Sequence, residues 1–191
     1  MNGSNEKNGK MLRLAVLLGM VLLAAALRVL PHPWNFAPVG AMALFSGAMF
    51  RNRWLAFAAP ILALFAGDLF IGFYKVMFAV YLSFALSVAI GRWLAENRSV
   101  LRIGGAVLLG ALQFFLVSNF AMWAFSDYYP HTRAGLFTCF VAAVPYFWNT
   151  LAGDVLYSAV LFGGFALAER MAPALQAREP HSAASISRTA R

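Results

Sequence analysis

The sequence predicts an all-α integral membrane protein with six transmembrane helices, both termini in the cytoplasm, and a short interfacial helix before the sixth span. Three observations predict this class. Of the 191 residues, 62% are hydrophobic and 12% are charged, against about half and a quarter in a soluble domain. The mean hydropathy is +0.71. The apolar residues occur in long runs, and most Lys and Arg residues between these runs fall on one side of the predicted membrane.

Each span is predicted from a run that meets or approaches the roughly 20 apolar residues needed to cross a bilayer. Spans one, three, four and five are predicted at 11–30, 54–74, 76–94 and 101–125, and the second is a shorter run at 37–50. The last apolar region, 135–168, would be about 51 Å long as one helix, too long for a single crossing. Because Pro145 favours a break, we expect a short interfacial helix at 135–145 and the sixth span at 146–168.

The basic residues set the orientation. With both ends in the cytoplasm, twelve Lys and Arg residues lie inside and only Arg28, Lys75 and Arg133 lie outside, as the positive-inside rule requires. We therefore expect a multi-pass protein of the cell inner (plasma) membrane. A competing interpretation is a cleaved signal peptide, because Lys7 and Lys10 precede an apolar run and the small residues at 24–26.

The predicted transmembrane domain, 11–170, lies between two polar tails. Residues 1–10 are polar, and 171–191 are basic and rich in Ala and Ser. Neither tail carries enough apolar surface to fold alone. We therefore expect both to be disordered cytoplasmic segments.

Several functional classes find no support in the residues. The net charge is +8, but the basic residues are scattered and form no face for nucleic acid. Cys139 is the single cysteine, which excludes a Cys-cluster zinc site, and His32 and His131 are expected to be solvated loop residues. The sequence has no serine with a base and orienting acid, no paired metal-ligand motif and no P-loop. We expect no catalytic residues, no cofactor and no bound metal.

Polar side chains inside the spans gather at one level. On the predicted topology, Asp68 and Asn119 lie about 9 Å below the outer surface. A carboxylate in hydrocarbon costs at least about 2.5 kcal/mol, so it needs a partner or a water-filled cavity. Polar residues of the other spans and of the first loop fall at the same outer level. They predict a substrate-binding pocket that opens outward and is closed below, formed by Arg28, Trp34, Asn35, Asp68, Tyr81, Asn119, Asn149 and Asp154.

The two aspartates share a local sequence, "AGD", at 66–68 and at 152–154. A Gly just before an Asp lets another helix approach closely and leaves backbone groups within reach of the carboxylate. A structural interpretation is that Asp68 and Asp154 pair with Arg28 or bond Asn119 and so fix helix packing. Structural and ligand-binding roles can coexist in the same residue.

The chain resembles an uncharacterised bacterial membrane family of transport proteins. The blocks that carry this likeness cover most of 28–163 and include "RVLPHPWNFAPVGAMALFSGAMF" at 28–50, "GDLFIGF" at 67–73, "VYLSFAL" at 80–86, "SNFAMW" at 118–123 and "PYFWNTLAGDVLYSAVLFG" at 145–163. At the next level, the chain is similar to the substrate-binding S components of energy-coupling-factor (ECF) vitamin transporters, which have six helices and a pocket near the outer face under a first-loop lid.

This resemblance implies that loop 31–37 is the lid and that a vitamin- or cofactor-like solute binds beneath it. It also implies a transmembrane coupling subunit with two ATPases, for which the nearest docking motif here is Ala15-x-x-x-Gly19. Two alternatives come from other classes. One is a proton-coupled secondary transporter using Asp68 and Asp154, which predicts polar residues continuing to the cytoplasmic side. The other is a membrane enzyme or assembly protein acting on a lipid-linked substrate.

Overall fold

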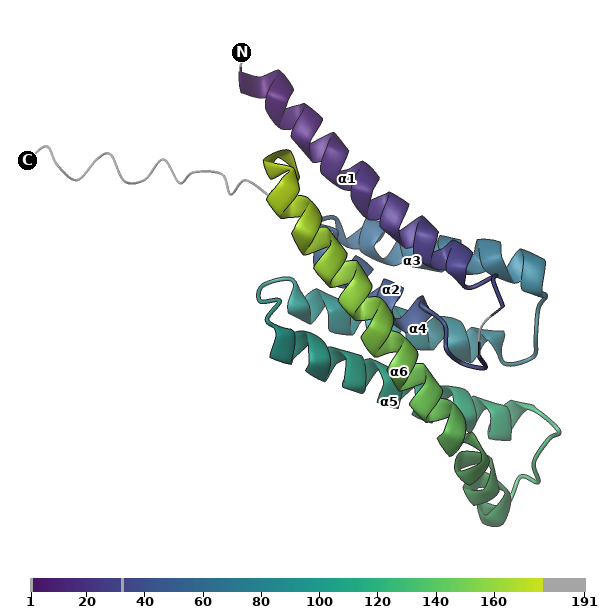
Figure 1. Ribbon diagram of the computed structural model, residues 1–191. Coiled ribbons are helices and arrows are strands. Elements are labelled where there is room, and N and C mark those ends of the chain that lie inside the picture. Colours follow the sequence, from purple (N-terminus) through teal and green to yellow (C-terminus); the bar gives the residue numbers. More distant parts are fainter. Residues whose placement is uncertain (1, 32, 177–191) are drawn as a thin grey trace, which may run out of the picture.

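All regular structure in the described part of the chain is helical. The computed structural model describes residues 2–31 and 33–176. Five of its helices are long and apolar enough to cross a membrane, as in a multi-pass membrane protein, and they form one elongated bundle (Figure 1). The elements are α1 (Asn2–Leu27), α2 (Val39–Met49), α3 (Arg53–Ile71), α4 (Met77–Leu94), α5 (Val100–Phe125), α6 (Arg133–Met171) and the 3-10 helix η1 (Pro173–Leu175).

The second apolar run forms a short central helix, α2. Its 11 residues give a length of about 16 Å, roughly half of a bilayer core. Ten of the 11 are buried, which is the pattern of a helix surrounded by other helices. A Cβ atom on Gly47 or on Gly91 would overlap the backbone of the facing helix. The two glycines therefore let α2 and α4 pack backbone to backbone.

The predicted break at Pro145 is wrong. Residues 135–145, expected as a separate interfacial helix, belong to α6, a single helix of 39 residues with Pro145 inside it. Helices in membrane proteins tolerate proline where other groups satisfy the freed backbone carbonyl. At about 58 Å, α6 is longer than a bilayer core, and it runs obliquely to α3, α4 and α5 (Figure 1).

Parts of the two predicted tails are helical. Helix α1 begins at Asn2, so residues 2–10, expected to be disordered, are helical. After α6, the helix η1 packs against both α1 and α6, and Leu175 is buried. The remainder of the predicted C-terminal tail, 177–191, lies outside the described residues.

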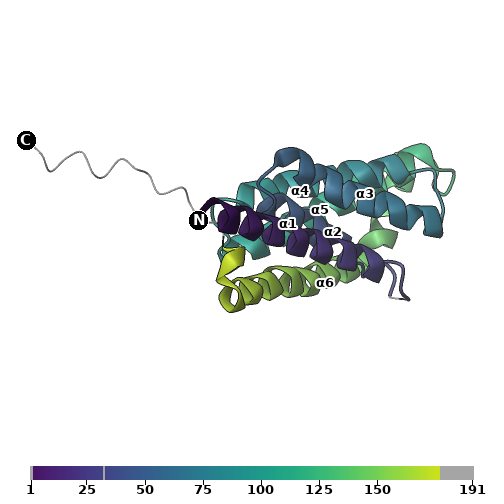
Figure 2. The same cartoon turned by 90° about the horizontal axis from the view of Figure 1, so that it is seen from above.

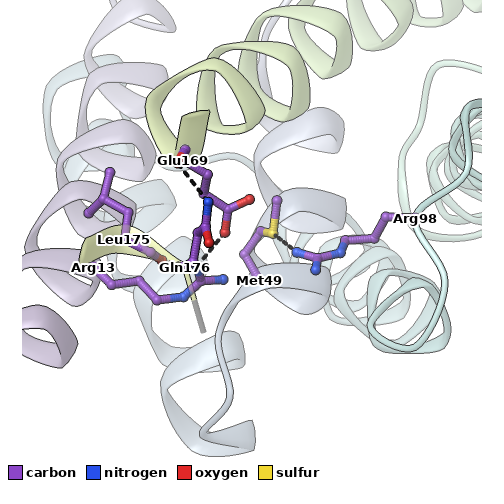
Figure 3. A network of polar contacts seen from close by, with 6 residues as sticks. All are labelled: Arg13, Met49, Arg98, Glu169, Leu175 and Gln176. Atoms are coloured by element: carbon purple, nitrogen blue, oxygen red, sulfur yellow. Dashed lines mark hydrogen bonds and ion pairs between the residues drawn. The ribbon is translucent and has the colours of Figure 1, made fainter. Parts of the chain in front are cut away.

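The first turn of α1 and the last turn of α6 lie at the same end of the bundle (Figures 1 and 2). We call this end the termini face. Arg13 joins the two helices there, because its guanidinium donates to the Glu169 carboxylate at 2.5 Å and to the Leu175 carbonyl at 2.5 Å (Figure 3). Arg98 contacts the Met49 sulfur at 2.8 Å in the same region (Figure 3).

A packed core lies between this charged network and the centre of the bundle. The Phe45 ring packs edge to face against Phe162 and Phe165, with centroids 5.3 and 6.0 Å apart. Arg92 closes the end of α2 by donating to the Phe50 carbonyl at 2.7 Å. The termini face is therefore sealed by aromatic packing and by polar contacts. The opposite end, which carries loops 28–38, 72–76 and 126–132, is called the pocket face below.

Candidate functional site

A cavity of about 850 Å³ lies at the pocket face. Helices α4, α5 and α6 supply about half of its wall, and loop 28–38 with the first residues of α2 supplies most of the rest. Ile71, Tyr74 and Val76 complete it. Most of the lining is apolar or aromatic. The cavity brings together five of the eight predicted site residues: Arg28, Trp34, Asn35, Asn119 and Asp154.

Asp68 and Tyr81 do not line the cavity but hold a residue that does. The Asp68 side chain is fully buried. One of its oxygens, Oδ1, lies 2.6 Å from the Arg28 guanidinium, and the other, Oδ2, accepts a hydrogen bond from the Tyr81 hydroxyl at 2.8 Å. Arg28 also donates to the Leu64 carbonyl at 3.3 Å. This ion pair confirms the structural interpretation of Asp68 and fixes the start of loop 28–38 against α3.

Asp154 lines the cavity and caps α2 from another helix. Pro38 occupies the N-cap position of α2 and gives no side-chain cap. The Asp154 carboxylate instead accepts a hydrogen bond from the backbone N–H of Ala41 at 3.0 Å. This N–H is among the first amides of the helix, which have no partner within it, and a carboxylate is favourable at the positive end of the helix dipole. A side chain at Gly40 would overlap this carboxylate.

The glycine of each AGD segment lets a neighbouring group come close to the helix that carries the aspartate. A Cβ atom on Gly67 would lie 3.1 Å from the Arg28 guanidinium, and one on Gly153 would lie 3.3 Å from the Phe36 Cα atom. Both distances are shorter than ordinary van der Waals contact. Each glycine thus allows a close approach, but not of another helix as predicted: the neighbour is a side chain at Gly67 and the backbone of loop 28–38 at Gly153.

The predicted asparagines have three different roles. Asn149 lies outside the cavity lining and donates to the Trp34 carbonyl at 3.0 Å, holding loop 28–38 against α6. Asn35 has a φ of 61°, in the left-handed region that Asn tolerates better than most residues. Asn119 lines the cavity while its side chain donates to the Phe115 carbonyl of its own helix at 2.7 Å. Trp34 is 81% exposed at the rim.

The aromatic walls of the cavity were not predicted from the sequence. Phe84 of α4 stacks on Phe114 of α5 with centroids 5.7 Å apart. Phe115 meets Phe147 of α6 edge to face at 5.3 Å. All four line the cavity. In a chain with 18 Phe residues, no spacing distinguishes those that face a cavity from those that face lipid.

A polar group at the deep end of the cavity was also missed. Ser87 and Gly110 line this end. The Gln113 amide donates to the Ser83 carbonyl at 2.9 Å and to the Ser87 hydroxyl at 3.0 Å. Gln113 stands alone in an apolar run, so the criterion that selected Asp68 would also have found it. Beyond Gly110 lies the side chain of Leu44 on α2.

Groups at the loops of the pocket face have shifted pKa values. Lys75 and Asp127 lie 2.9 Å apart and join loop 72–76 to loop 126–132. Their hydrogen bond raises the pKa of Lys75 and lowers that of Asp127. Burial, and next the charge of Asp68, raise the pKa of Tyr74, which lines the cavity.

Cys139 and His131, which the sequence also brought into question, do not line the cavity. Cys139 is buried and its thiol lies 3.5 Å from the Asn119 carbonyl. His131 contacts the Ser126 carbonyl at 3.3 Å, and His32 is outside the described residues. In the part of the chain that the structure describes, no three His, Cys, Asp or Glu side chains gather as a metal site would require.

Comparison with known proteins identifies a family. No curated protein and no solved structure matches the chain. Residues 8–175 match a family model described as a family of unknown function, DUF6580. Since this match covers most of the described helices, the chain belongs to the DUF6580 family.

Proposed function

We propose that the protein is a membrane transport protein, the solute-binding subunit for uptake of a vitamin- or cofactor-like small molecule. The observation that carries this proposal is the cavity of about 850 Å³ at the pocket face. Small-molecule sites commonly enclose about 300–1,000 Å³ and combine apolar walls with a few convergent polar groups. The Phe-rich walls, Arg28 and Asp154 match this description.

The arrangement supports binding from one side. On the proposed topology, the termini face is cytoplasmic and the pocket face is external, as the positive-inside rule favours. Below the cavity, Phe45, Phe162 and Phe165 pack together, and the Arg13 contacts hold the termini face closed. A solute would therefore enter from outside and remain above this closed end.

Loop 28–38 has the contacts that a lid requires. Its first residue, Arg28, is anchored by the buried Asp68. Farther along, the Trp34 carbonyl is held by a hydrogen bond from Asn149. We propose that the anchored end stays in place while the contact between Trp34 and Asn149 breaks and re-forms as solute passes. This is the role implied by the likeness to ECF S components.

Proton-coupled transport is the alternative that the geometry favours less. Both carboxylate oxygens of Asp68 are held, one by Arg28 and one by Tyr81, and Asp68 does not line the cavity. Asp154 would have to pass its proton through the packed phenylalanines toward the termini face. A binding subunit needs no such path.

The proposed coupling partner is a transmembrane subunit served by two ATPases. Ala15 and Gly19 lie on the exposed side of α1, and a Cβ atom on Gly19 would meet no other atom within 4 Å. Small residues on a free helix face allow a second helix to approach closely. Affinity purification from native membranes distinguishes coupled from solitary action, because a coupled subunit brings its ATPases with it.

A matched pair of glycine substitutions on α5 tests the binding role. Gly110 faces the cavity, whereas a side chain on Gly105 would meet no other atom within 4 Å. We expect purified wild-type protein and Gly105→Leu to retain the same small molecule from a metabolite extract, identified by mass spectrometry. A side chain on Gly110 would begin against Leu44 and Ser87 at the deep end of the cavity. Gly110→Leu is therefore expected to retain about tenfold less or none, since a filled site excludes its ligand.

The controls separate loss of binding from loss of folding. Both variants should elute as folded protein in size-exclusion chromatography and show similar melting temperatures. If wild type retains nothing above the level of Gly110→Leu, the solute-binding proposal is wrong.

A further inference from the structure

We propose that the cavity accepts an organic cation, a protonated or quaternary amine on an apolar or aromatic body, with its charged nitrogen against Asp154 and its body between the phenylalanine walls. This inference rests on the proposed function and names the chemical class of the solute.

The first step is the difference between the two buried aspartates. Both oxygens of Asp68 are engaged, one by the Arg28 guanidinium and one by the Tyr81 hydroxyl. Asp154 is 3% exposed and takes part in none of the ion pairs among the described residues. Within the described ranges, its one hydrogen bond comes from the backbone of Ala41. Asp68 thus carries its counter-charge within the protein, and Asp154 does not.

The second step is the charge of the cavity. Arg28 and Asp154 are the only charged side chains among the described lining residues. The charge of Arg28 is already balanced by Asp68 at 2.6 Å. The N-terminus of α2 offers Asp154 about half a positive charge. Ionisation of Asp154 would therefore leave the lining with a net negative charge, and a cationic ligand would supply the missing counter-charge.

The third step is the chemistry of the walls. Phe84, Phe114, Phe115 and Phe147 line the same cavity as Asp154. The face of an aromatic ring attracts a cation within about 6 Å, and aromatic sites recognise quaternary ammonium groups in this way. The same rings also bury apolar surface. Aromatic walls with one carboxylate suit an organic cation better than an inorganic ion, for which the described residues offer no cluster of three ligands.

The experiment sorts ligands by charge before any is identified. A metabolite extract is separated at neutral pH by ion exchange into cationic, neutral and anionic pools. Each pool is incubated with purified protein in detergent, and the retained compounds are identified by mass spectrometry. We expect retention from the cationic pool by wild type and by Gly105→Leu, and its loss in Gly110→Leu.

Asp154→Asn tests the role of the carboxylate. The amide oxygen of Asn can still accept the Ala41 N–H, and Asn is a good helix cap, so α2 keeps its cap while the charge is removed. Titration with the retained cation should show that Asp154→Asn binds it at least about tenfold more weakly than wild type does. This is the effect expected when one member of a buried charge pair is removed. Gly105→Leu, where a side chain would meet no other atom within 4 Å, controls for general loss of the fold.

The outcomes separate this inference from the proposed function. Retention only from the neutral or anionic pool, or an Asp154→Asn variant that binds the cation as tightly as wild type, overturns the organic-cation inference while binding stands. Retention from no pool overturns the proposed function itself. The comparison between pools uses wild-type protein, so it decides the question even if Asp154→Asn does not fold.

Discussion

At the residue scale, the segment Ala-Gly-Asp occurs twice in the chain, and its aspartate has a different role in each copy. Gly67 admits the Arg28 guanidinium, and Asp68 binds it. Gly153 admits the backbone of loop 28–38, and the next residue, Asp154, binds the first turn of α2. In each copy, the glycine leaves space for a neighbouring segment next to the carboxylate. What that carboxylate binds is decided by the segment that packs there.

Removing the Asp68 charge should destabilise the protein. Asp68→Asn leaves the Arg28 guanidinium without its counter-charge in a site where only 13% of the side chain is exposed. We expect a loss of about 3 kcal/mol in the free energy of unfolding, since breaking a buried pair costs this much. Tyr81→Phe removes one hydrogen bond and should cost about 1 kcal/mol. Chemical unfolding in detergent, followed by tryptophan fluorescence, measures both.

The control is a variant in which both charges are replaced by apolar groups. Arg28→Met with Asp68→Leu should recover most of the lost stability, because it leaves no unpaired charge. An Asp68→Asn protein as stable as wild type would contradict the structural role of the ion pair.

The sequence identifies the polar residues of the site but not their pairings. A charged or amide side chain in an apolar run needs a partner, and this argument found Asp68, Asn119 and Asp154. It could not show that Arg28 meets Asp68 while Asp154 meets a helix end. Those contacts join residues 40 and 113 positions apart and depend on how each helix is rotated in the bundle.

At the element scale, apolar length predicted the long helices well and the irregular ones poorly. The four long runs before residue 126 each became one helix. Length arguments assume helices close to the membrane normal, so the same reasoning divided α6 at Pro145. An oblique helix needs no such break (Figure 1). The short run 37–50 became a central helix of 11 residues, ten of them buried, directly after loop 28–38.

The contact between α2 and α4 should depend on its two glycines. Gly47→Ala and Gly91→Ala each force a methyl group into the backbone of the opposite helix, and we expect a loss of about 2 kcal/mol for either. Gly104→Ala is the matched control, since a Cβ atom there meets no other atom within 4 Å. It should be neutral or stabilising by about 0.5–1 kcal/mol, as alanine favours helix.

The stabilities of Gly47→Ala, Gly91→Ala and Gly104→Ala are compared by measuring their melting temperatures in the same detergent. Equal stabilities for Gly47→Ala and Gly104→Ala would mean that α2 does not pack against α4 at this distance.

At the scale of the whole molecule, the two ends of the bundle have opposite characters. The termini face is closed by Arg13, Arg92 and a phenylalanine core. The pocket face contains the cavity and three connecting loops. The sequence predicted this asymmetry, because polar residues of spans one, three, four, five and six and of the first loop fall at the same outer level. The volume and the aromatic walls of the cavity could not be predicted, since they depend on helix tilt and on which Phe side chains face inward.

The direction of this asymmetry in the membrane decides whether the cavity can serve uptake. Tyr128 is 82% exposed in loop 126–132 at the pocket face, and Glu96 is exposed between α4 and α5 at the termini face. Replacing the buried Cys139 by alanine gives a background without thiols. In that background, we expect a membrane-impermeant maleimide to label Tyr128→Cys on intact cells, but Glu96→Cys only after permeabilisation.

The expected labelling follows from the basic residues. With the termini face in the cytoplasm, 12 of the 15 Lys and Arg residues lie inside, and reversing the protein would place those 12 outside against the positive-inside rule. If Glu96→Cys were labelled on intact cells and Tyr128→Cys were not, the cavity would open to the cytoplasm. A subunit that captures solute for uptake would then be excluded. The same cavity would have to load from within the cell, so this labelling pattern separates uptake from export before any ligand is known.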